Sequence, residues 1–234
     1  MRAGAEPVLA AAPVGSEAAQ AGVSASTGAG PGTGPDDSRP LVLACGPRAK
    51  GNSDRAAELM AQGLAQAGAA PRLAYLRDMA VSPCLGCQRC AVSPGHACVL
   101  QATDQAETVF GWILAAPLVL FSSPIYFYHL PAGFKGLIDR AQRFYAARMA
   151  GDPALAALPR RTAQVCLVAG RPRGEKLFEG SLLTLRYFLW PFNVALAEPL
   201  CLPGLDAPGD LRAAPDTEAR VAAYAAQAWQ SLER

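Results

Sequence analysis

Four cysteines lie close together in the chain, with the spacing C-x2-C-x2-C-x7-C: Cys84, Cys87, Cys90 and Cys98. Two successive two-residue gaps bring three thiolates around one small volume, and the fourth cysteine completes the set. Such a set suits an iron–sulfur cube, which takes one thiolate at each of its iron corners. Tetrahedral zinc is a second option, although zinc sites more often pair two separated C-x2-C units. A group of redox-active or structural thiols is a third.

A glycine-containing loop, residues 45–53, reads Cys-Gly-Pro-Arg-Ala-Lys-Gly-Asn-Ser and precedes a helical pattern. Glycines permit close backbone approach, and the N–H groups at a helix start attract an anion. Arg48 adds positive charge, and Asn52 and Ser53 add neutral donors. The loop lacks the sequence of nucleoside-triphosphate and dinucleotide sites. It fits one terminal phosphate monoester, such as that of FMN; an ordinary strand-to-helix turn with exposed charges is the alternative.

A second loop, which starts at Ser122, carries bulky apolar residues where loops are usually polar. Pro124 forces Ser123 into an extended conformation, so the chain leaves the preceding strand in a fixed direction. The bulky residues that follow are Ile125, Tyr126 and Phe127. They predict a flat aromatic ligand lying against the loop, with backbone N–H groups bonded to its polar edge. A loop packed beneath a helix or inside a dimer interface is the alternative.

Strand and helix patterns alternate about five times, with strands predicted over residues 41–45, 72–76, 117–121, 163–169 and 193–200. This alternation predicts an α/β fold of three layers, a doubly wound five-stranded parallel sheet with helices on both faces. Ligands of such sheets bind beyond the carboxyl ends of the strands, at the point where the strand order reverses. Both loops, the cysteines and the turn at Ala169 and Gly170 would lie at this edge.

Composition divides the chain. Residues 1–40 are rich in Ala, Gly, Pro, Ser and Thr and show no apolar periodicity, so we expect a disordered leader rather than an export signal. Residues 41–234 suit one domain without a membrane span. The net charge of +2 is small, and the basic spots at 160–161 and 171–173 are interpreted as solvated surface, not a nucleic-acid stripe. Seven cysteines without an export signal favour the cytoplasm.

Together the two loops resemble the flavodoxin-like NAD(P)H-dependent FMN reductase family, including its iron–sulfur flavoprotein branch. The resemblance rests on Gly46-Pro47-Arg48, Gly51-Asn52-Ser53, Ser123-Pro124-Ile125-Tyr126, Lys135 and Asp139-Arg140. Two departures stand out. Cys45-Gly46 replaces the usual Gly-Ser, which removes one hydroxyl donor, and the paired aspartates that often follow the last cysteine appear only as Thr103-Asp104.

The resemblance implies a set of FMN contacts. Arg48, Asn52 and Ser53 would hold the phosphate; Ser123, Pro124, Ile125, Tyr126 and Phe127 would lie along the isoalloxazine, and Ala169 and Gly170 would approach it from the next strand end. In the iron–sulfur branch a compact cysteine run of this kind binds a [4Fe–4S] cluster, which would make ligands of Cys84, Cys87, Cys90 and Cys98.

The activity implied is NAD(P)H-linked reduction of a quinone, a flavin or a similar small acceptor, with FMN as cofactor. A [4Fe–4S] cluster would relay single electrons and make a ferredoxin a partner, and the family habit of completing the flavin pocket between subunits implies a homodimer. Two other classes stay open: a non-enzymatic electron carrier of flavodoxin type, which would oxidise NAD(P)H slowly or not at all, and a zinc-stabilised interaction module with a vestigial flavin site.

Overall fold

The computed structural model describes residues 39–232, so the predicted leader lies outside the described residues except for positions 39 and 40. The sheet contains β1 (Leu41–Ala44), β2 (Arg72–Tyr75), β3 (Val119–Pro124), β4 (Arg161–Ala169), β5 (Val194–Leu196) and β6 (Leu200–Pro203). All strands are parallel and follow the order β2-β1-β3-β4-β5, with β6 also paired to β4. The predicted parallel sheet is confirmed, and its order is that of flavodoxin-like folds.

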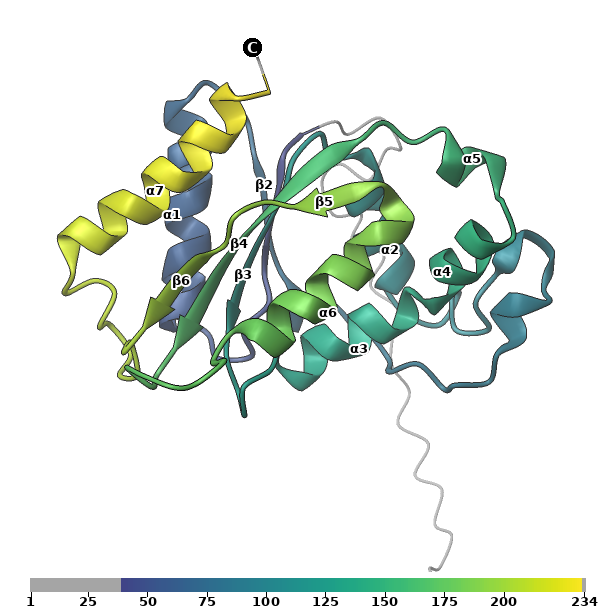
Figure 1. Ribbon diagram of the computed structural model, residues 1–234, viewed down its shortest axis with the longest axis horizontal. Helices are drawn as coiled ribbons and strands as arrows, with labels where there is room; N and C mark the ends of the chain where they lie inside the picture. Colours follow the sequence, from purple (N-terminus) through teal and green to yellow (C-terminus); the bar gives the residue numbers. More distant parts are fainter. Residues whose placement is uncertain (1–38, 233–234) are drawn as a thin grey trace, which may run out of the picture. The chain divides into compact units, whose positions relative to one another are not determined.

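Helices cover both faces of the sheet (Figure 1). They are α1 (Asn52–Gln66), α2 (Ala106–Ala115), α3 (Ala132–Arg140), α4 (Gln142–Met149), α5 (Pro153–Ala156), α6 (Glu179–Leu189) and α7 (Pro215–Gln230). One core lies between the sheet and the helix pair α1 and α7, and a second core lies beneath α2, α3, α4 and α6. The architecture is therefore the expected three-layer, doubly wound one. No helix within residues 39–232 combines the length and the apolar character needed to cross a bilayer.

The fifth strand position is filled by two short strands instead of the single strand predicted over residues 193–200. β5 pairs with the start of β4 and β6 with its end. Pro199 lies between them and has no N–H to donate, so the ladder is interrupted there. Tyr224 of α7 bridges the gap, because its hydroxyl accepts from the Val165 N–H (3.2 Å) and donates to the Glu198 carbonyl (2.8 Å).

Arg161 is buried, which corrects its interpretation as surface charge: only 9% of the residue is exposed. Its guanidinium donates to three carbonyls at the end of α2, those of Ile113 (2.9 Å), Leu114 (3.0 Å) and Ala116 (2.5 Å). The last carbonyls of a helix have no intrahelical partner, and a cation there also suits the helix dipole. Arg161 thus fastens the end of α2 to the start of β4.

Close contact between α1 and α7 depends on Gly63. A Cβ added there would lie 2.0 Å from the backbone oxygen of Ala222, so one helix would have to move. We predict that Gly63→Ala lowers the free energy of unfolding by about 1–3 kcal/mol. Gly111→Ala in α2 is the matched control, because its Cβ would meet open space. There the gain in helix propensity should stabilise the fold by about 0.5–1 kcal/mol.

Urea unfolding of both variants provides the measurement. Equal stabilities for the two would contradict the packing described for α1 and α7.

Candidate functional site

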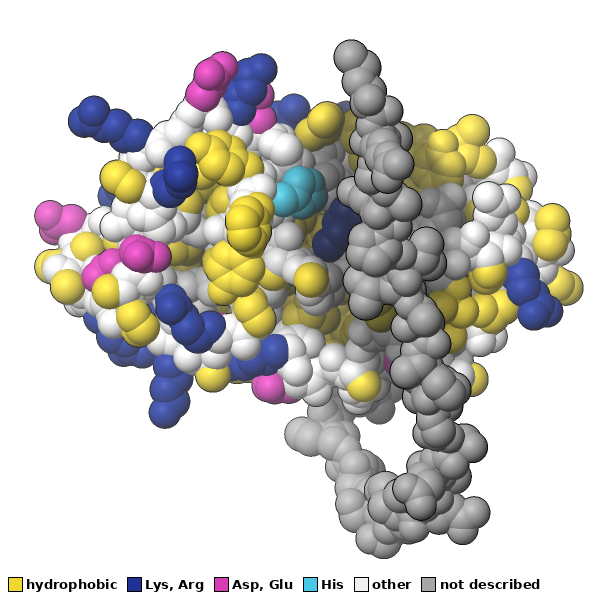
Figure 2. Space-filling model, turned by 90° about the horizontal axis from the view of Figure 1, so that it is seen from below, with side chains coloured by type: hydrophobic (Ala, Val, Ile, Leu, Met, Phe, Trp, Pro, Cys, Tyr) yellow, Lys and Arg dark blue, Asp and Glu magenta, His cyan; other side chains and the backbone are white. Residues whose placement is uncertain are grey.

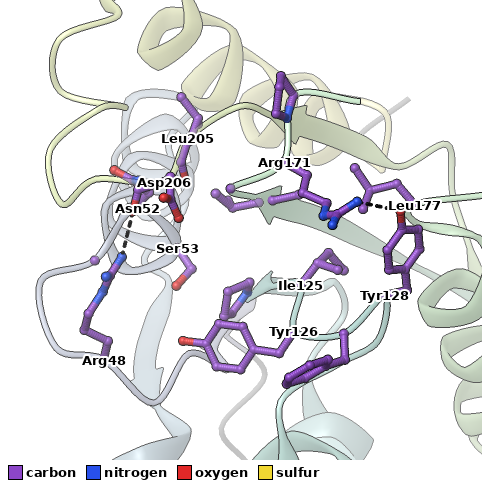
Figure 3. A pocket seen from close by; sticks show the side chains of 17 residues that line it. Arg48, Asn52, Ser53, Ile125, Tyr126, Tyr128, Arg171, Leu177, Leu205 and Asp206 are labelled. Atoms are coloured by element: carbon purple, nitrogen blue, oxygen red, sulfur yellow. Dashed lines mark hydrogen bonds between the residues drawn. The ribbon is translucent and has the colours of Figure 1, made fainter. Parts of the chain in front are cut away.

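The chain runs from β1 to β2 on one side and returns to β3 on the other, so the strand order reverses between β1 and β3. A crevice is expected at the carboxyl ends of these two strands. A cavity of about 580 Å3 lies there, between the start of α1 and the loops that follow β3, β4 and β6 (Figure 3). Hydrophobic side chains gather among scattered Lys and Arg on this face of the molecule (Figure 2).

Nine of the ten residues predicted to contact a flavin line this one cavity: Arg48, Asn52, Ser53, Pro124, Ile125, Tyr126, Phe127, Ala169 and Gly170. The tenth, Ser123, is fully buried and does not line it; its hydroxyl donates to the Pro124 carbonyl (3.1 Å). Residues 48–53 lead from β1 into α1, and residues 123–127 and 169–170 lie at the carboxyl ends of β3 and β4. The topology therefore brings the predicted set together, apart from Ser123.

The first turn of α1 offers hydrogen-bond donors to the cavity. Gly51 is the N-cap and supplies no capping side chain, so the first N–H groups of the helix lack intrahelical partners. The Ser53 hydroxyl points into the cavity and has no hydrogen-bond partner among residues 39–232 (Figure 3). Arg48 stands at the rim, where Nη2 donates to the Asp206 carbonyl (3.5 Å). Donors plus a cation at a helix start form an anion site.

Asp54 holds this loop in shape, although none of the sequence motifs includes it. One carboxylate oxygen accepts from the Lys50 N–H (2.7 Å) and the other from Arg77 Nη1 (2.8 Å). The first contact fixes Lys50 in a left-handed conformation, with φ of 60°, which a lysine rarely adopts. An acidic residue in the first turn of a helix was the available signal.

Asn52 uses its side chain differently from the prediction. Its Nδ2 group donates to the carbonyls of Leu205 (3.2 Å) and Ala207 (2.9 Å). Its Oδ1 atom accepts from the N–H groups of Gly209 (3.3 Å) and Leu211 (3.2 Å). The amide therefore ties α1 to the loop after β6, and only the backbone N–H of Asn52 remains for an anion. The same tie places Leu205 and Asp206 in the cavity wall.

Two glycines leave room for the cavity walls. A Cβ on Gly46 would lie 2.5 Å from the Ser53 hydroxyl oxygen, and one on Gly170 would lie 2.5 Å from Asp206 Oδ1. A serine at position 46 would therefore compete with Ser53 for the same space. This contact explains why position 46 is glycine here and not the serine of the family pattern. The Ser53 hydroxyl already lies beside the space that a side chain at position 46 would fill.

A tight hairpin forms the opposite wall. Tyr126 and His129 exchange two backbone hydrogen bonds (2.9 and 3.0 Å), which leaves Phe127 and Tyr128 as the two tip residues. Both tip residues have positive φ, 50° and 64°. Two-residue hairpins of this kind normally carry Asn or Gly at the tip, because a bulky residue in the left-handed region costs about 1–2 kcal/mol. Arg171 and Leu177, also missed from the sequence, complete this wall.

The four clustered cysteines line a second cavity, of about 560 Å3, which also borders Arg140 and Arg143. All seven cysteines of the chain are free thiols. Burial, followed by the proximity of the other three clustered thiols, raises the pKa of Cys90. Within residues 39–232 no three His, Cys, Asp or Glu side chains are placed to hold a single metal ion. The thiols thus share a cavity without converging on one point.

The neck of this cysteine loop is closed by hydrogen bonds between its two ends. The Ala80 N–H donates to the Gln105 side chain (2.8 Å), and the Gln105 N–H donates to the Ala80 carbonyl (2.7 Å). One turn further in, the Ser82 N–H donates to Asp104 (2.9 Å), while Arg140 Nη1 donates to both the Ser82 carbonyl (3.1 Å) and Asp104 (2.5 Å). The motif residues Asp104 and Arg140 therefore form a buried ion pair that closes the neck of the loop, which we call the lock.

Arg140 carries a buried charge with spare donors. Its side chain has no solvent exposure, and its Nε and Nη2 atoms lack hydrogen-bond partners among the described residues. Burial works to lower the pKa of Arg140, but the hydrogen bond to Asp104 and the nearby Cys98 thiol raise it overall. Spare N–H groups beside thiols suit an anionic sulfur ligand. A thiolate-bound cluster and a tetrahedral zinc both need thiols that converge on one point, and within residues 39–232 the thiols do not converge in this way, so their placement favours neither.

Comparison with known proteins finds one matching family and several solved structures of similar fold. A profile of the family described as NADPH-dependent FMN reductase matches residues 39–172. Among solved structures, an NAD(P)H:quinone oxidoreductase from Methanothermobacter marburgensis is 21% identical with a TM-score of 0.63, over 84% of this chain and 96% of that one. An FMN-dependent NADH-azoreductase from Bacillus anthracis, solved with FMN, is 11% identical with a TM-score of 0.55, over 81% and 98%.

A flavone reductase is 13% identical with a TM-score of 0.60; the match covers 83% of this chain but spans only 63% of the flavone reductase. At these identities the structural likeness establishes the shared fold alone. No curated protein matches the sequence.

The buried lock at the loop neck yields a stability prediction. Asp104→Asn would leave Arg140 as an unpaired buried charge and should cost about 3–5 kcal/mol of unfolding free energy at pH 7. Although burial works to raise it, the hydrogen bond from Arg140 and those from two backbone N–H groups hold the pKa of Asp104 below its ordinary value. The ionised carboxylate therefore stabilises the fold above about pH 4, and this contribution is lost as the pH falls through the lowered pKa.

Denaturant unfolding of Asp104→Asn and of wild type at pH 7 and near pH 3 tests this. The difference between their free energies of unfolding should be smaller near pH 3 than at pH 7. Asp78→Asn is the control, because Asp78 is 67% exposed and its ion pair with Arg77 is loose (3.8 Å). It should change stability by less than about 1 kcal/mol. A cost for Asp104→Asn no larger than the control's would refute the lock.

Proposed function

This chain belongs to the NADPH-dependent FMN reductase family, and we propose that it is an FMN-dependent oxidoreductase that uses NAD(P)H to reduce a quinone, a flavin or a similar small acceptor. One observation carries the proposal: a helix start with spare donors and an aromatic hairpin stand on opposite sides of a single cavity (Figure 3). The first suits a phosphate and the second suits a flat ring, which are the two ends of FMN.

The phosphate end would be held by the Ser53 hydroxyl, the backbone N–H groups that open α1, and the Arg48 guanidinium. Hydrogen bonds from neutral and charged donors to a phosphate are among the stronger ones in proteins. Arg48 can turn from its long contact with the Asp206 carbonyl (3.5 Å) to the phosphate. Asn52 contributes through its backbone and by holding the loop after β6 in place.

The ring end would lie against Pro124, Ile125 and Tyr126. The N–H groups of Ile125 and Tyr126 already donate to the carbonyls of Val168 (2.8 Å) and His129 (2.9 Å), so they do not serve the polar edge of the ring as the sequence analysis expected. The N–H groups at the hairpin tip remain for that role. When bound, FMN supplies the hydride chemistry; the residues named here bind it and exclude water from one side of it.

We also propose that the cysteine cavity holds a [4Fe–4S] cluster and that a ferredoxin can exchange electrons with it. Four thiols border one cavity, and a buried cation with two spare N–H groups borders it too. A thiolate-ligated cluster is anionic, so Arg140 would offset its charge, and Cys98 already lies beside that guanidinium. The electrons would reach small acceptors at the other cavity.

A homodimer in the cytoplasm completes the proposal. Free thiols throughout the chain favour a reducing compartment. Among the aromatic residues of α4 and of residues 187–192, Phe144, Phe188 and Phe192 are buried and belong to the core. Tyr145, Tyr187 and Trp190 remain exposed, with Met149 and Leu183 nearby in sequence, and these residues offer apolar surface to a second copy.

The FMN site is tested by Ser53→Ala. Losing one hydrogen bond to a charged group costs about 1.5–3 kcal/mol, so the Kd for FMN should rise by about ten- to a hundredfold. Fluorescence quenching of FMN on titration with apoprotein measures it. Ser231→Ala, on an exposed serine after α7, is the control and should leave the Kd unchanged. Equal Kd values for the two variants would place the phosphate elsewhere.

The cluster is tested on anaerobically purified protein by iron, sulfide and zinc analysis. Iron and sulfide near four per chain are expected, and Cys87→Ser should lower both. Cys201→Ser is the control, since that half-buried cysteine lies outside the cysteine cavity. Protein with FMN but without iron would refute the cluster and leave the reductase standing. Bound FMN without NAD(P)H oxidation would instead indicate an electron carrier.

A further inference from the structure

The hairpin tip at Phe127 is in an unfavourable conformation that the packing of its own side chain does not offset. Its φ of 50° lies in the left-handed region, where a residue with a Cβ is strained. Strain of this kind persists when burial over-determines it, yet the Phe127 side chain is fully exposed, at 103% of its reference area. Within the described residues no aromatic pair includes Phe127. The Phe127 ring therefore does not serve the stability of the fold, and its presence at the hairpin tip indicates another role.

The neighbouring tip residue explains how the strain is held. The Tyr128 hydroxyl accepts from Arg171 (3.4 Å) and sits where a side chain at Gly174 would collide with it, 2.7 Å from the added Cβ. His129 adds a bond from its ring to the Thr184 hydroxyl (3.1 Å). The first contact anchors the hairpin to the loop after β4 (Figure 3), and the second anchors it to α6. Phe127 is thus held out at the rim of the cavity by its anchored neighbours.

Phe127 also lines the cavity in which the proposed flavin would lie. The exposed Phe127 ring, on a hairpin whose neighbouring residues are anchored, has one favourable contact left to make beside a flavin site, which is stacking or edge contact with a second flat ring. A planar conjugated acceptor gains from that contact, whereas a compact inorganic ion such as ferricyanide cannot stack. The Phe127 ring would then discriminate between electron acceptors and would not hold the cofactor.

We infer that Phe127 is the specificity residue for the electron acceptor and that its ring favours planar conjugated acceptors, such as a quinone, over compact ions. The inference rests on the proposed function. In the net reaction NAD(P)H loses a hydride, one proton comes from solvent, and the quinone gains two electrons and two protons, so both ring carbonyls become hydroxyls. Phe127 takes no electrons or protons itself; it holds the quinone ring over the cavity.

The test compares kcat/KM for a planar naphthoquinone with that for ferricyanide, using the FMN-loaded full chain. In Phe127→Ala and Phe127→Gly the quinone-to-ferricyanide ratio should fall about tenfold, the size of one aromatic pair contact. Phe127→Trp keeps a flat ring and should keep the ratio within about twofold. Val92→Ala, an equally removable exposed apolar side chain outside both cavities, should change neither rate.

Thermal unfolding of the same variants separates the role of the ring from that of the backbone. Glycine tolerates positive φ, so Phe127→Gly should melt no lower than wild type, and higher than Phe127→Ala. An unchanged acceptor ratio in Phe127→Gly overturns the inference, and so does a melting temperature below that of Phe127→Ala.

Wild type that reduces ferricyanide but no quinone also overturns the inference, while leaving the reductase in place. Wild type that binds no FMN overturns both.

Discussion

The side-chain amide of Asn52 is the contact on which the cofactor cavity depends. Both of its amide hydrogens and its oxygen are bonded to the loop after β6, so the start of α1 and residues 205–211 are held as one unit. The strand order alone would place the ends of β1, β3 and β4 at one edge of the sheet. The Asn52 tie adds the wall from the end of the chain, and with it Leu205 and Asp206. Because the amide is buried, a lost partner there would leave polar groups unsatisfied.

The protein holds two differently built cavities, one at the carboxyl ends of the strands and one between the cysteine loop and the helices α3 and α4. Hydrogen bonds of Asp54 and Asn52 fix the floor of the first cavity before any ligand binds. Gly46 and Gly170 lie there in places where a side chain would collide with its neighbours. The wall opposite this floor is the strained hairpin with the exposed Phe127 ring. We infer that this ring contacts the electron acceptor. The second cavity belongs to a loop closed at its neck by Asp104 and Arg140. The proposed reductase would thus combine a cofactor site with fixed walls and a rim that selects the acceptor.

Much of this could be predicted from the sequence because the signals are local. The apolar run at 117–121 and the residues around Ser53 and Tyr126 report strands and loops through their own neighbours, and parallel topology then brings the loops together. Contacts between distant segments could not be predicted. Nothing near Asn52 reveals that residues 205–211 will occupy its amide, and nothing near Arg161 reveals that it will bind the end of α2. Asp104 and Arg140 were both noticed as motif pieces, but only the fold makes them partners.

The central claim is that FMN binds with its phosphate at the start of α1 and its ring toward the 125–129 hairpin. The most direct measurement is a titration of isotope-labelled protein with FMN, followed by amide resonances in heteronuclear NMR. With FMN bound in this way, the amide resonances of residues 46–54 and of the hairpin should shift together and saturate at one FMN per chain, while those of the cysteine loop stay in place. Shifts confined to the cysteine loop, or none at saturation, would contradict this claim.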